Sequence, residues 1–166
     1  GRVLNREGIQ EEVIRAIPQL DARLPDDPFL GRGSIVATHI DVRAGSLNVV
    51  PDRCSIVLDR RLTFGETAEQ ALEQVRALLP SAAADFEVEI LRYTQPSYNG
   101  YLREHDQVFP VWAFEESHPF VRAAVETARE VGLDTSTGKW NFSTNGAYWA
   151  GIAGIPSVGF GPGEEN

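Results

Sequence analysis

Several features that define other protein classes are missing from this chain of 166 residues. Cysteine occurs once, at Cys54, so no disulfide forms within the chain, and single-cysteine usage favours the reducing cytoplasm. No apolar run approaches the ~18 residues of a membrane span, and residues 1–6 do not resemble the apolar core of a signal peptide. The first residue is glycine and the last residues read as a loop, which predicts a piece of a longer protein.

Positive charge is also scarce, because the chain has a net charge of −9 and Lys139 is its only lysine. An acidic surface repels phosphate groups, which argues against nucleic acid and anionic membranes as partners. The three histidines (His39, His105 and His118) lie far apart in the sequence, and no HxxxH or CxxC pair occurs. We therefore expect neither metal ligands nor a catalytic group in this chain.

The first two-thirds of the chain is predicted to alternate between helices and strands. Apolar residues at helical spacing predict a helix over 7–24, which Pro18 should kink or split. A second helix should begin with a capping box of Thr67 and Gln70 and stop at Pro80. Strands are predicted over residues 34–42, 54–62 and 86–93, with a short fourth strand over 109–114. This order predicts an α+β fold, a two-layer ferredoxin-like sandwich with two helices on one face of an antiparallel sheet.

The pattern changes after residue 114, so we expect two domains, 1–113 and 114–166. Ser117-His118-Pro119 predicts a helix start, and Gly132 is placed to end that helix. Another helix should start near Ser143–Gly146, and Ile155–Phe160 reads as a buried strand of a parallel sheet. The second domain is therefore predicted to be a partial α/β segment. The glycines that follow suit the close approach of a substrate to the backbone.

Asp59 and Arg61 are the most informative polar residues. Strand alternation places Cys54, Ile56 and Leu58 on the helix-covered face, and Asp59 and Arg61 on the uncovered face. A guanidinium there would bind a carboxylate through two parallel hydrogen bonds. The alternative is that Arg61 is only the structural partner of Asp59.

Three segments together resemble the lid domain of one enzyme family: Asn48–Asp52, Leu58–Arg61 and Gly65–Thr67. The family is that of the dinuclear zinc amidohydrolases and peptidases, which includes acetylornithine deacetylase, succinyl-diaminopimelate desuccinylase, aminoacylase and glutamate carboxypeptidase. Segments Tyr93–Tyr98 and Lys139–Asn145 are most similar to the branch of selenium-metabolism-linked hydrolases.

The resemblance implies a fragment of a zinc-dependent hydrolase of amide bonds in N-acyl amino acids or peptides. It implies a lid that forms a homodimer, a carboxylate-bearing substrate, and two zinc ions whose ligands are not in this chain. Asn145 stands where the family often has Asp or Glu. The alternative is a non-catalytic module for small-molecule binding or dimerisation. Residues at positions that match the family's substrate-facing ones are Asn48, Arg61, Asn145, Gly161 and Gly163.

Overall fold

The computed structural model describes residues 2–3, 9–46, 48–49, 51, 53–79 and 86–161. They form two compact units, 1–108 and 109–166, which are treated one at a time. The first unit combines helices with small antiparallel sheets, which is compatible with the predicted α+β class. The assignment of 1–113 to a lid and of 114–166 to a catalytic domain stays a prediction.

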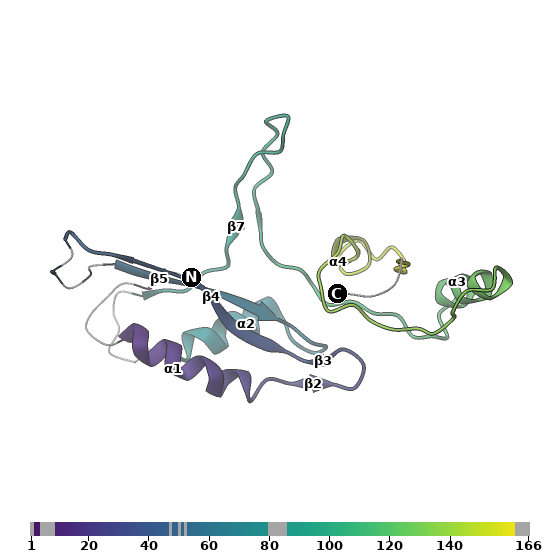
Figure 1. Ribbon diagram of the computed structural model, residues 1–166, viewed down its shortest axis with the longest axis horizontal. Coiled ribbons are helices and arrows are strands. Elements are labelled where there is room, and N and C mark those ends of the chain that lie inside the picture. The colour runs from purple at the N-terminus through teal and green to yellow at the C-terminus, as the bar shows by residue number, and fades with distance from the viewer. Residues whose placement is uncertain are drawn as a thin grey trace. The chain divides into compact units, whose positions relative to one another are not determined.

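A long hairpin dominates the first unit (Figure 1). Strands β4 (Ser34–Arg43) and β5 (Arg53–Arg61) pair in antiparallel fashion along their whole length, which confirms the strands expected over 34–42 and 54–62. Two short strands, β1 (Arg2–Val3) and β6 (Phe86–Glu87), complete a sheet of order β4-β5-β1-β6. Strand β4 therefore forms one edge of this sheet.

A β-bulge at Thr38 interrupts the alternation of β4. Ala37 pairs with Leu58, but the next pair is His39 with Val57, so Thr38 is the extra residue. Its hydroxyl donates a hydrogen bond to the carbonyl of Val57, 3.3 Å away. The bulge shifts the alternation by one residue, which puts Ile40 opposite Ile56 and moves His39 and Asp41 to the uncovered face.

Helix α1 (Ile9–Asp21) contributes three buried residues to the apolar core. Its residues Ile17 and Leu20 pack with Leu24 and with Ile35 of β4, and a second cluster joins Val13 to Cys54 and Ile56. Pro18 lies inside α1, so of the two predicted effects, a kink or a split, the split is wrong. The helix continues because Pro18 still accepts a hydrogen bond at its carbonyl, from the Ala22 N–H.

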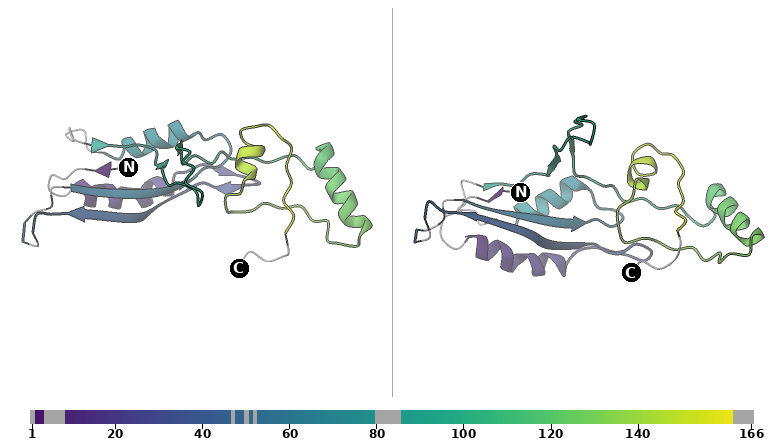
Figure 2. Two further views of the ribbon diagram at one scale, coloured as in Figure 1. Left: turned by 90° about the horizontal axis from the view of Figure 1, so that it is seen from above. Right: turned by 45° about the horizontal axis from the view of Figure 1, so that its top comes forward.

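Helix α2 (Ala68–Arg76) begins as predicted, because Thr67 and Gln70 form both hydrogen bonds of a capping box. Its residue Val75, together with Leu78 beyond the helix, packs against the same core cluster as α1. Both helices thus lie against the side of the β4–β5 hairpin that carries Ile35 and Leu58 (Figure 2). Pro80, the expected end of the helix, lies outside the described residues.

The strand expected over 86–93 is wrong as a single element. β6 spans Phe86–Glu87 and pairs with β1. The chain then leaves the sheet, and β7 (Arg92–Tyr93) pairs with β8 (His105–Asp106) in a hairpin of its own. A second small hairpin, β2 (Asp26–Asp27) with β3 (Gly31–Arg32), lies in the turn-rich connection after α1.

The second unit contains helices α3 (Pro119–Glu130) and α4 (Gly146–Trp149). His118 caps α3 by accepting a hydrogen bond from the Phe120 N–H, and Gly132 follows the helix with a φ of 76°, so both predicted ends are confirmed. Residues 109–161 form no strand, so the strands expected over 109–114 and 155–160 are wrong. A strand of a parallel sheet needs neighbouring strands, and the described part of this unit offers none.

Candidate functional site

Arg61 lies on the uncovered face of the sheet, at the end of β5. Cys54 and Ile56 are buried on the opposite face, so the predicted alternation of this strand is confirmed. Arg61 Nε lies 3.6 Å from Asp59 Oδ2, and these two side chains are 60% and 47% exposed. An ion pair this exposed contributes at most about 1 kcal/mol. The guanidinium remains accessible, so both interpretations of Arg61 stand on this geometry.

The neighbouring Arg60 points the other way and is buried, which the sequence reasoning missed. Arg60 forms an ion pair with Glu66, and the two side chains are only 9% and 5% exposed. Glu66 also accepts a hydrogen bond from the backbone N–H of Thr63, at 3.0 Å. The Thr63 hydroxyl donates to the Gly31 carbonyl at 2.8 Å. Arg60 also donates a hydrogen bond to Gln74 Oε1 of α2, at 3.2 Å. The network therefore fastens the end of β5, and hence the backbone of Arg61, to β3 and to α2.

A glycine is required at position 33 because the same network fills the space beside it. A Cβ atom on Gly33 would lie 2.9 Å from Glu66 Oε2 and 3.0 Å from the Arg61 carbonyl oxygen. The Nε of Arg60 is buried without a hydrogen-bond partner within the described part of the chain. Because Arg60 Nε is already unsatisfied, replacing another member of this buried network should lower the stability of the fold further.

Asn48 lies at the other end of the hairpin, in the loop that joins β4 to β5 (Figure 1). It is exposed, and its Oδ1 accepts a hydrogen bond from the Ser46 hydroxyl at 2.6 Å. β5 runs for nine residues between this loop and Arg61. At about 3.4 Å per residue, the strand separates its two ends by roughly 27 Å. Within one chain the structure therefore does not bring Asn48 and Arg61 together.

The other predicted site residues lie in the second unit. Asn145 is exposed and precedes α4 without a side-chain cap hydrogen bond. Gly161 is exposed near the Trp140 ring, and Gly163 lies outside the described residues. Gly159 shows why glycine occurs in this run, because a Cβ atom there would lie 1.7 Å from the Trp140 ring. The absence of a side chain at Gly159 therefore leaves room for the Trp140 indole ring.

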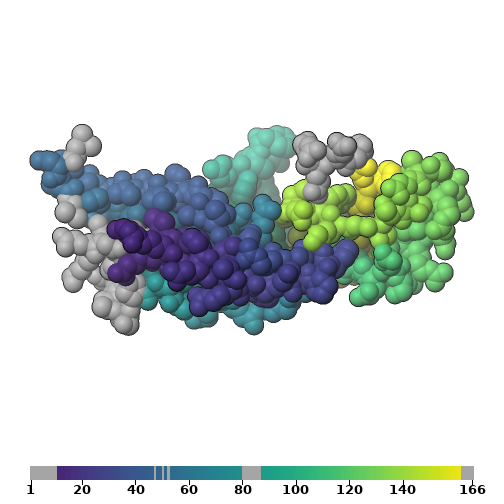
Figure 3. All heavy atoms as spheres, turned by 60° about the horizontal axis from the view of Figure 1, so that its bottom comes forward, coloured from purple at the N-terminus to yellow at the C-terminus, as the bar shows by residue number. Residues whose placement is uncertain are grey.

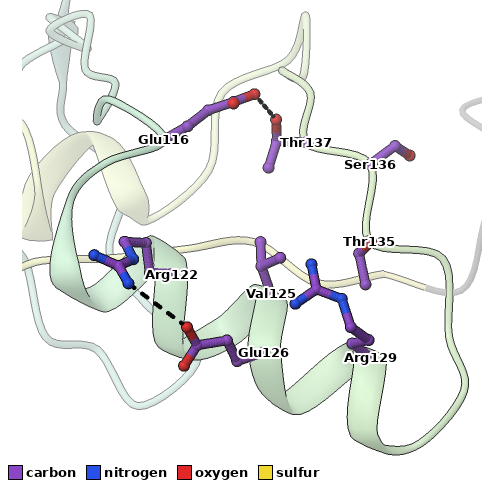
Figure 4. A pocket seen from close by; sticks show the side chains of 8 residues that line it. All are labelled: Glu116, Arg122, Val125, Glu126, Arg129, Thr135, Ser136 and Thr137. Atoms are coloured by element: carbon purple, nitrogen blue, oxygen red, sulfur yellow. Dashed lines mark hydrogen bonds and ion pairs between the residues drawn. The ribbon is translucent and has the colours of Figure 1, made fainter.

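A hollow of about 390 Å³ lies between α3 and the segment that follows it (Figure 4). Arg122 faces Glu126 across 3.9 Å, and Glu116 accepts a hydrogen bond from the Thr137 hydroxyl. Two arginines and two glutamates leave the lining without net charge. None of the residues predicted from the sequence lines this hollow. Its lining consists of Glu116, Arg122, Val125, Glu126, Arg129, Thr135, Ser136 and Thr137.

Two titratable groups of the first unit show how it is held together. Asp21 accepts hydrogen bonds from the Ile35 N–H and from Arg32, both at 2.9 Å, and these bonds lower the pKa of its carboxyl below 3.8. Burial, with a smaller effect of the Asp41 charge, raises the pKa of the Cys54 thiol. Cys54 is therefore an inert core thiol, as the sequence predicted.

A two-zinc centre does not fit the described residues, because they contain no group of three or more His, Cys, Asp or Glu side chains that would hold a metal ion. The histidines serve other contacts. His105 stacks on Tyr93 with ring centroids 5.5 Å apart, and His118 caps α3. Among the described helices, none has the length and apolar character that a membrane span needs.

Comparisons with known proteins extend this picture. Residues 8–87 match the M20 peptidase dimerisation domain. Protein YgeY of Escherichia coli K12, whose name calls it uncharacterized, is 39% identical over 154 residues, and YgeY of Escherichia coli O157:H7 is equally similar. The alignment covers 92% of this chain but only 38% of the length of these curated relatives.

These findings make the chain similar to M20 peptidases over the dimerisation domain, in agreement with the resemblance that the sequence motifs indicated. The matched residues contain the whole β4–β5 hairpin with both helices α1 and α2. The first unit is therefore similar to a peptidase dimerisation domain over residues 8–87. The assignment to the selenium-metabolism-linked branch, and the roles of the individual residues, stay predictions.

Proposed function

We propose that this chain is part of a cytoplasmic, zinc-dependent M20 hydrolase that cleaves amide bonds of N-acyl amino acids or peptides. In this proposal the first unit is a ferredoxin-like lid, and the second belongs to the catalytic domain. The match of residues 8–87 to a peptidase dimerisation domain carries the proposal. The sheet order β4-β5-β1-β6, with α1 and α2 on one face, agrees with a split βαβ lid. Any zinc ligands would belong to residues other than those described.

The lid is proposed to form a symmetric homodimer through β4. This strand is an edge of the sheet, and its residues Val36, Ile40 and Val42 are each about half-exposed. A ten-residue apolar edge strand invites pairing with another chain unless something covers it. α1 (purple) lies beside the blue β4–β5 hairpin on one face of the first unit, so a partner at this edge would also meet the helix (Figure 3).

We propose that Arg61 binds the carboxylate of the substrate and that Asn48 serves a different site from Arg61. A small-molecule pocket of ~300–1,000 Å³ is only about 7–10 Å across. Asn48 and Arg61 lie at opposite ends of the nine-residue β5. One substrate would therefore meet Arg61 of one chain and Asn48 of the other chain. Asn145, Gly161 and Gly163 are also proposed to take part in substrate binding.

Subunit complementation tests this proposal in the complete enzyme. Arg61→Ala and Asn48→Ala are each made in separate chains, mixed in equal amounts, and assayed against a panel of N-acetyl amino acids. Random mixing makes half of the dimers hybrid, and each hybrid regains one of its two sites. We expect the mixture to recover about a quarter of the wild-type activity. No recovery would mean that one chain supplies both groups. No hydrolysis by the wild-type enzyme on any amide would favour the non-catalytic module.

A further inference from the structure

A hairpin arm, residues 91–107, follows the matched dimerisation domain by only a few residues. β7 and β8 form its base, where the Gln107 N–H donates to the Leu91 carbonyl at 2.7 Å. Every residue of the arm is exposed. A two-stranded hairpin with no covered face is only marginally stable in water. Within the described residues, the arm therefore packs against no other element, although a hairpin of this kind normally does so.

The tip of the arm is nevertheless a defined turn. The Gly100 N–H donates to the Ser97 carbonyl at 2.9 Å, and Gly100 has a φ of 82°, which favours glycine. The Asn99 side chain accepts from the Tyr101 N–H at 3.0 Å and from the Ser97 hydroxyl at 2.5 Å. These bonds hold Tyr98 at the apex, where it is 103% exposed. The turn thus presents an aromatic ring outward at little entropic cost.

The composition of the arm is that of a protein interface. It holds three of the four tyrosines of the chain: Tyr93, Tyr98 and Tyr101. Residues 94–102 carry no charged side chain. At the base, Arg92 forms ion pairs with Glu104 and Asp106, at 3.6 and 3.4 Å. Interface cores are depleted in charge and enriched in tyrosine. The arm therefore divides into a charged base and an uncharged aromatic tip.

We propose that the tip of the arm packs against a second copy of this chain and extends the dimer contact beyond the β4 edge. Two copies that each carry a charge of −9 repel one another, so surfaces that meet across a dimer must be locally neutral. The uncharged tip meets that requirement. It also continues directly from a domain of the dimerisation type, which ends at residue 87. This inference rests on the proposed homodimer but adds residues that lie outside the matched domain.

Site-directed cross-linking tests where the tip lies. Tyr98→Cys creates the only reactive thiol of the 166-residue chain, because Cys54 is buried. The thiol is labelled with a benzophenone maleimide, and ¹⁵N-labelled and unlabelled copies are exchanged before irradiation. We expect cross-linked peptides that join one heavy and one light half. Cross-links joining only halves of equal label would place the tip on its own chain and overturn the proposal. Tyr148→Cys, at an exposed tyrosine of α4, is the matched labelling control.

Sedimentation of the unlabelled variants gives an independent readout. Tyr98→Ala combined with Tyr101→Ala should weaken the dimer about tenfold or more, as expected for two central aromatic contacts. Tyr148→Ala should change the dissociation constant less than twofold. An unchanged constant in the double variant would overturn the arm contact and leave the proposed lid dimer standing. A wild-type chain that stays monomeric at high micromolar concentration would overturn both proposals.

Discussion

Two adjacent arginines at the end of β5 illustrate how one residue's environment decides its role. Arg60 and Arg61 point to opposite faces of the sheet, so the first is buried in an ion pair with Glu66 and the second is exposed beside Asp59. Guanidinium groups stay charged at any working pH. The buried one must therefore be compensated inside the protein, whereas the exposed one lies at the surface, where water also screens its charge.

Arg61→Ala in the complete enzyme should lower kcat/KM, with a loss of transition-state stabilisation of about 2–4 kcal/mol. This is the scale of a charge-assisted contact left unmade. The melting temperature should change little, because the pair with Asp59 is exposed. Kinetics and thermal melting on the same samples check this. A large melting loss with unchanged kcat/KM would assign Arg61 to structure instead.

Arg60→Ala is the matched control and should behave in the opposite way. Removing it leaves Glu66 buried without its ion-pair partner, which costs about 3–5 kcal/mol of stability. Denaturant unfolding measures this loss directly. If Arg60→Ala and Arg61→Ala unfolded alike, the assigned orientations of the two side chains would be wrong.

Asp21 should make the first unit sensitive to acid. Its pKa is lowered in the folded state, so its bonds to the Ile35 N–H and to Arg32 stabilise the fold above the ordinary carboxyl pKa of 3.8. That contribution is lost as the pH falls through the lowered folded-state value. Asp21→Asn should therefore flatten the pH dependence of stability below about pH 4. Urea titrations of both proteins between pH 2 and 6 check this, and parallel curves would contradict it.

At the scale of elements, the sequence predicted the helix starts and the strands that depend on contacts between nearby residues. The capping box of Thr67 with Gln70 and the His118 cap depend on residues a few positions apart, and both were legible in the sequence. The paired strands β4 and β5 were legible too, because their alternating side chains meet a core on one face. Such features need no knowledge of distant parts of the chain.

Features that depend on partners elsewhere were not predicted. The run 86–93 has the composition of one strand, yet it divides between β6, which pairs with β1, and β7, which pairs with β8. Ile155–Phe160 has strand-like composition, but the described second unit holds no neighbouring strand. The predicted site residues were likewise assigned one at a time by motif. The predicted strand over 54–62 already implied that Asn48 and Arg61 lie at opposite ends of it, but the motif assignment did not use that separation.

The bulge in β4 did leave a signal, in the step from Ile35 and Ala37 to Ile40. Deleting Thr38 would restore strict alternation and leave Ile35, Ala37 and Ile40 on one face, the same face as in the structure. We therefore expect the deletion to cost less than about 1 kcal/mol of stability, as does Thr38→Ala, which removes only the hydroxyl hydrogen bond to the Val57 carbonyl. Urea unfolding of both variants measures this. A much larger loss for the deletion than for Thr38→Ala would show that the fold needs the bulge itself.

For the whole molecule, the edge of β4 is where assembly should be most easily broken. Ile40→Lys places a charge in the middle of that edge and should convert the dimer to monomer, as charged edge residues block strand pairing. Ala77→Lys, at an exposed position after α2, adds the same charge elsewhere and should leave the dimer intact. Sedimentation equilibrium checks both variants. A dimer that survives Ile40→Lys would place the interface elsewhere.

The length of β5 has a final consequence for how the proposed enzyme would respond to its own abundance. A site that draws Arg61 from one chain and Asn48 from the other exists only while two chains are associated. Dilution would then silence the enzyme reversibly, and its specific activity would climb with total protein before levelling off. At low protein concentration, where most chains are monomers, the total activity would vary with the square of the chain concentration. Because β5 separates the two groups within one chain, the rate at which the protein is synthesised would control the activity of the enzyme, with no effector needed.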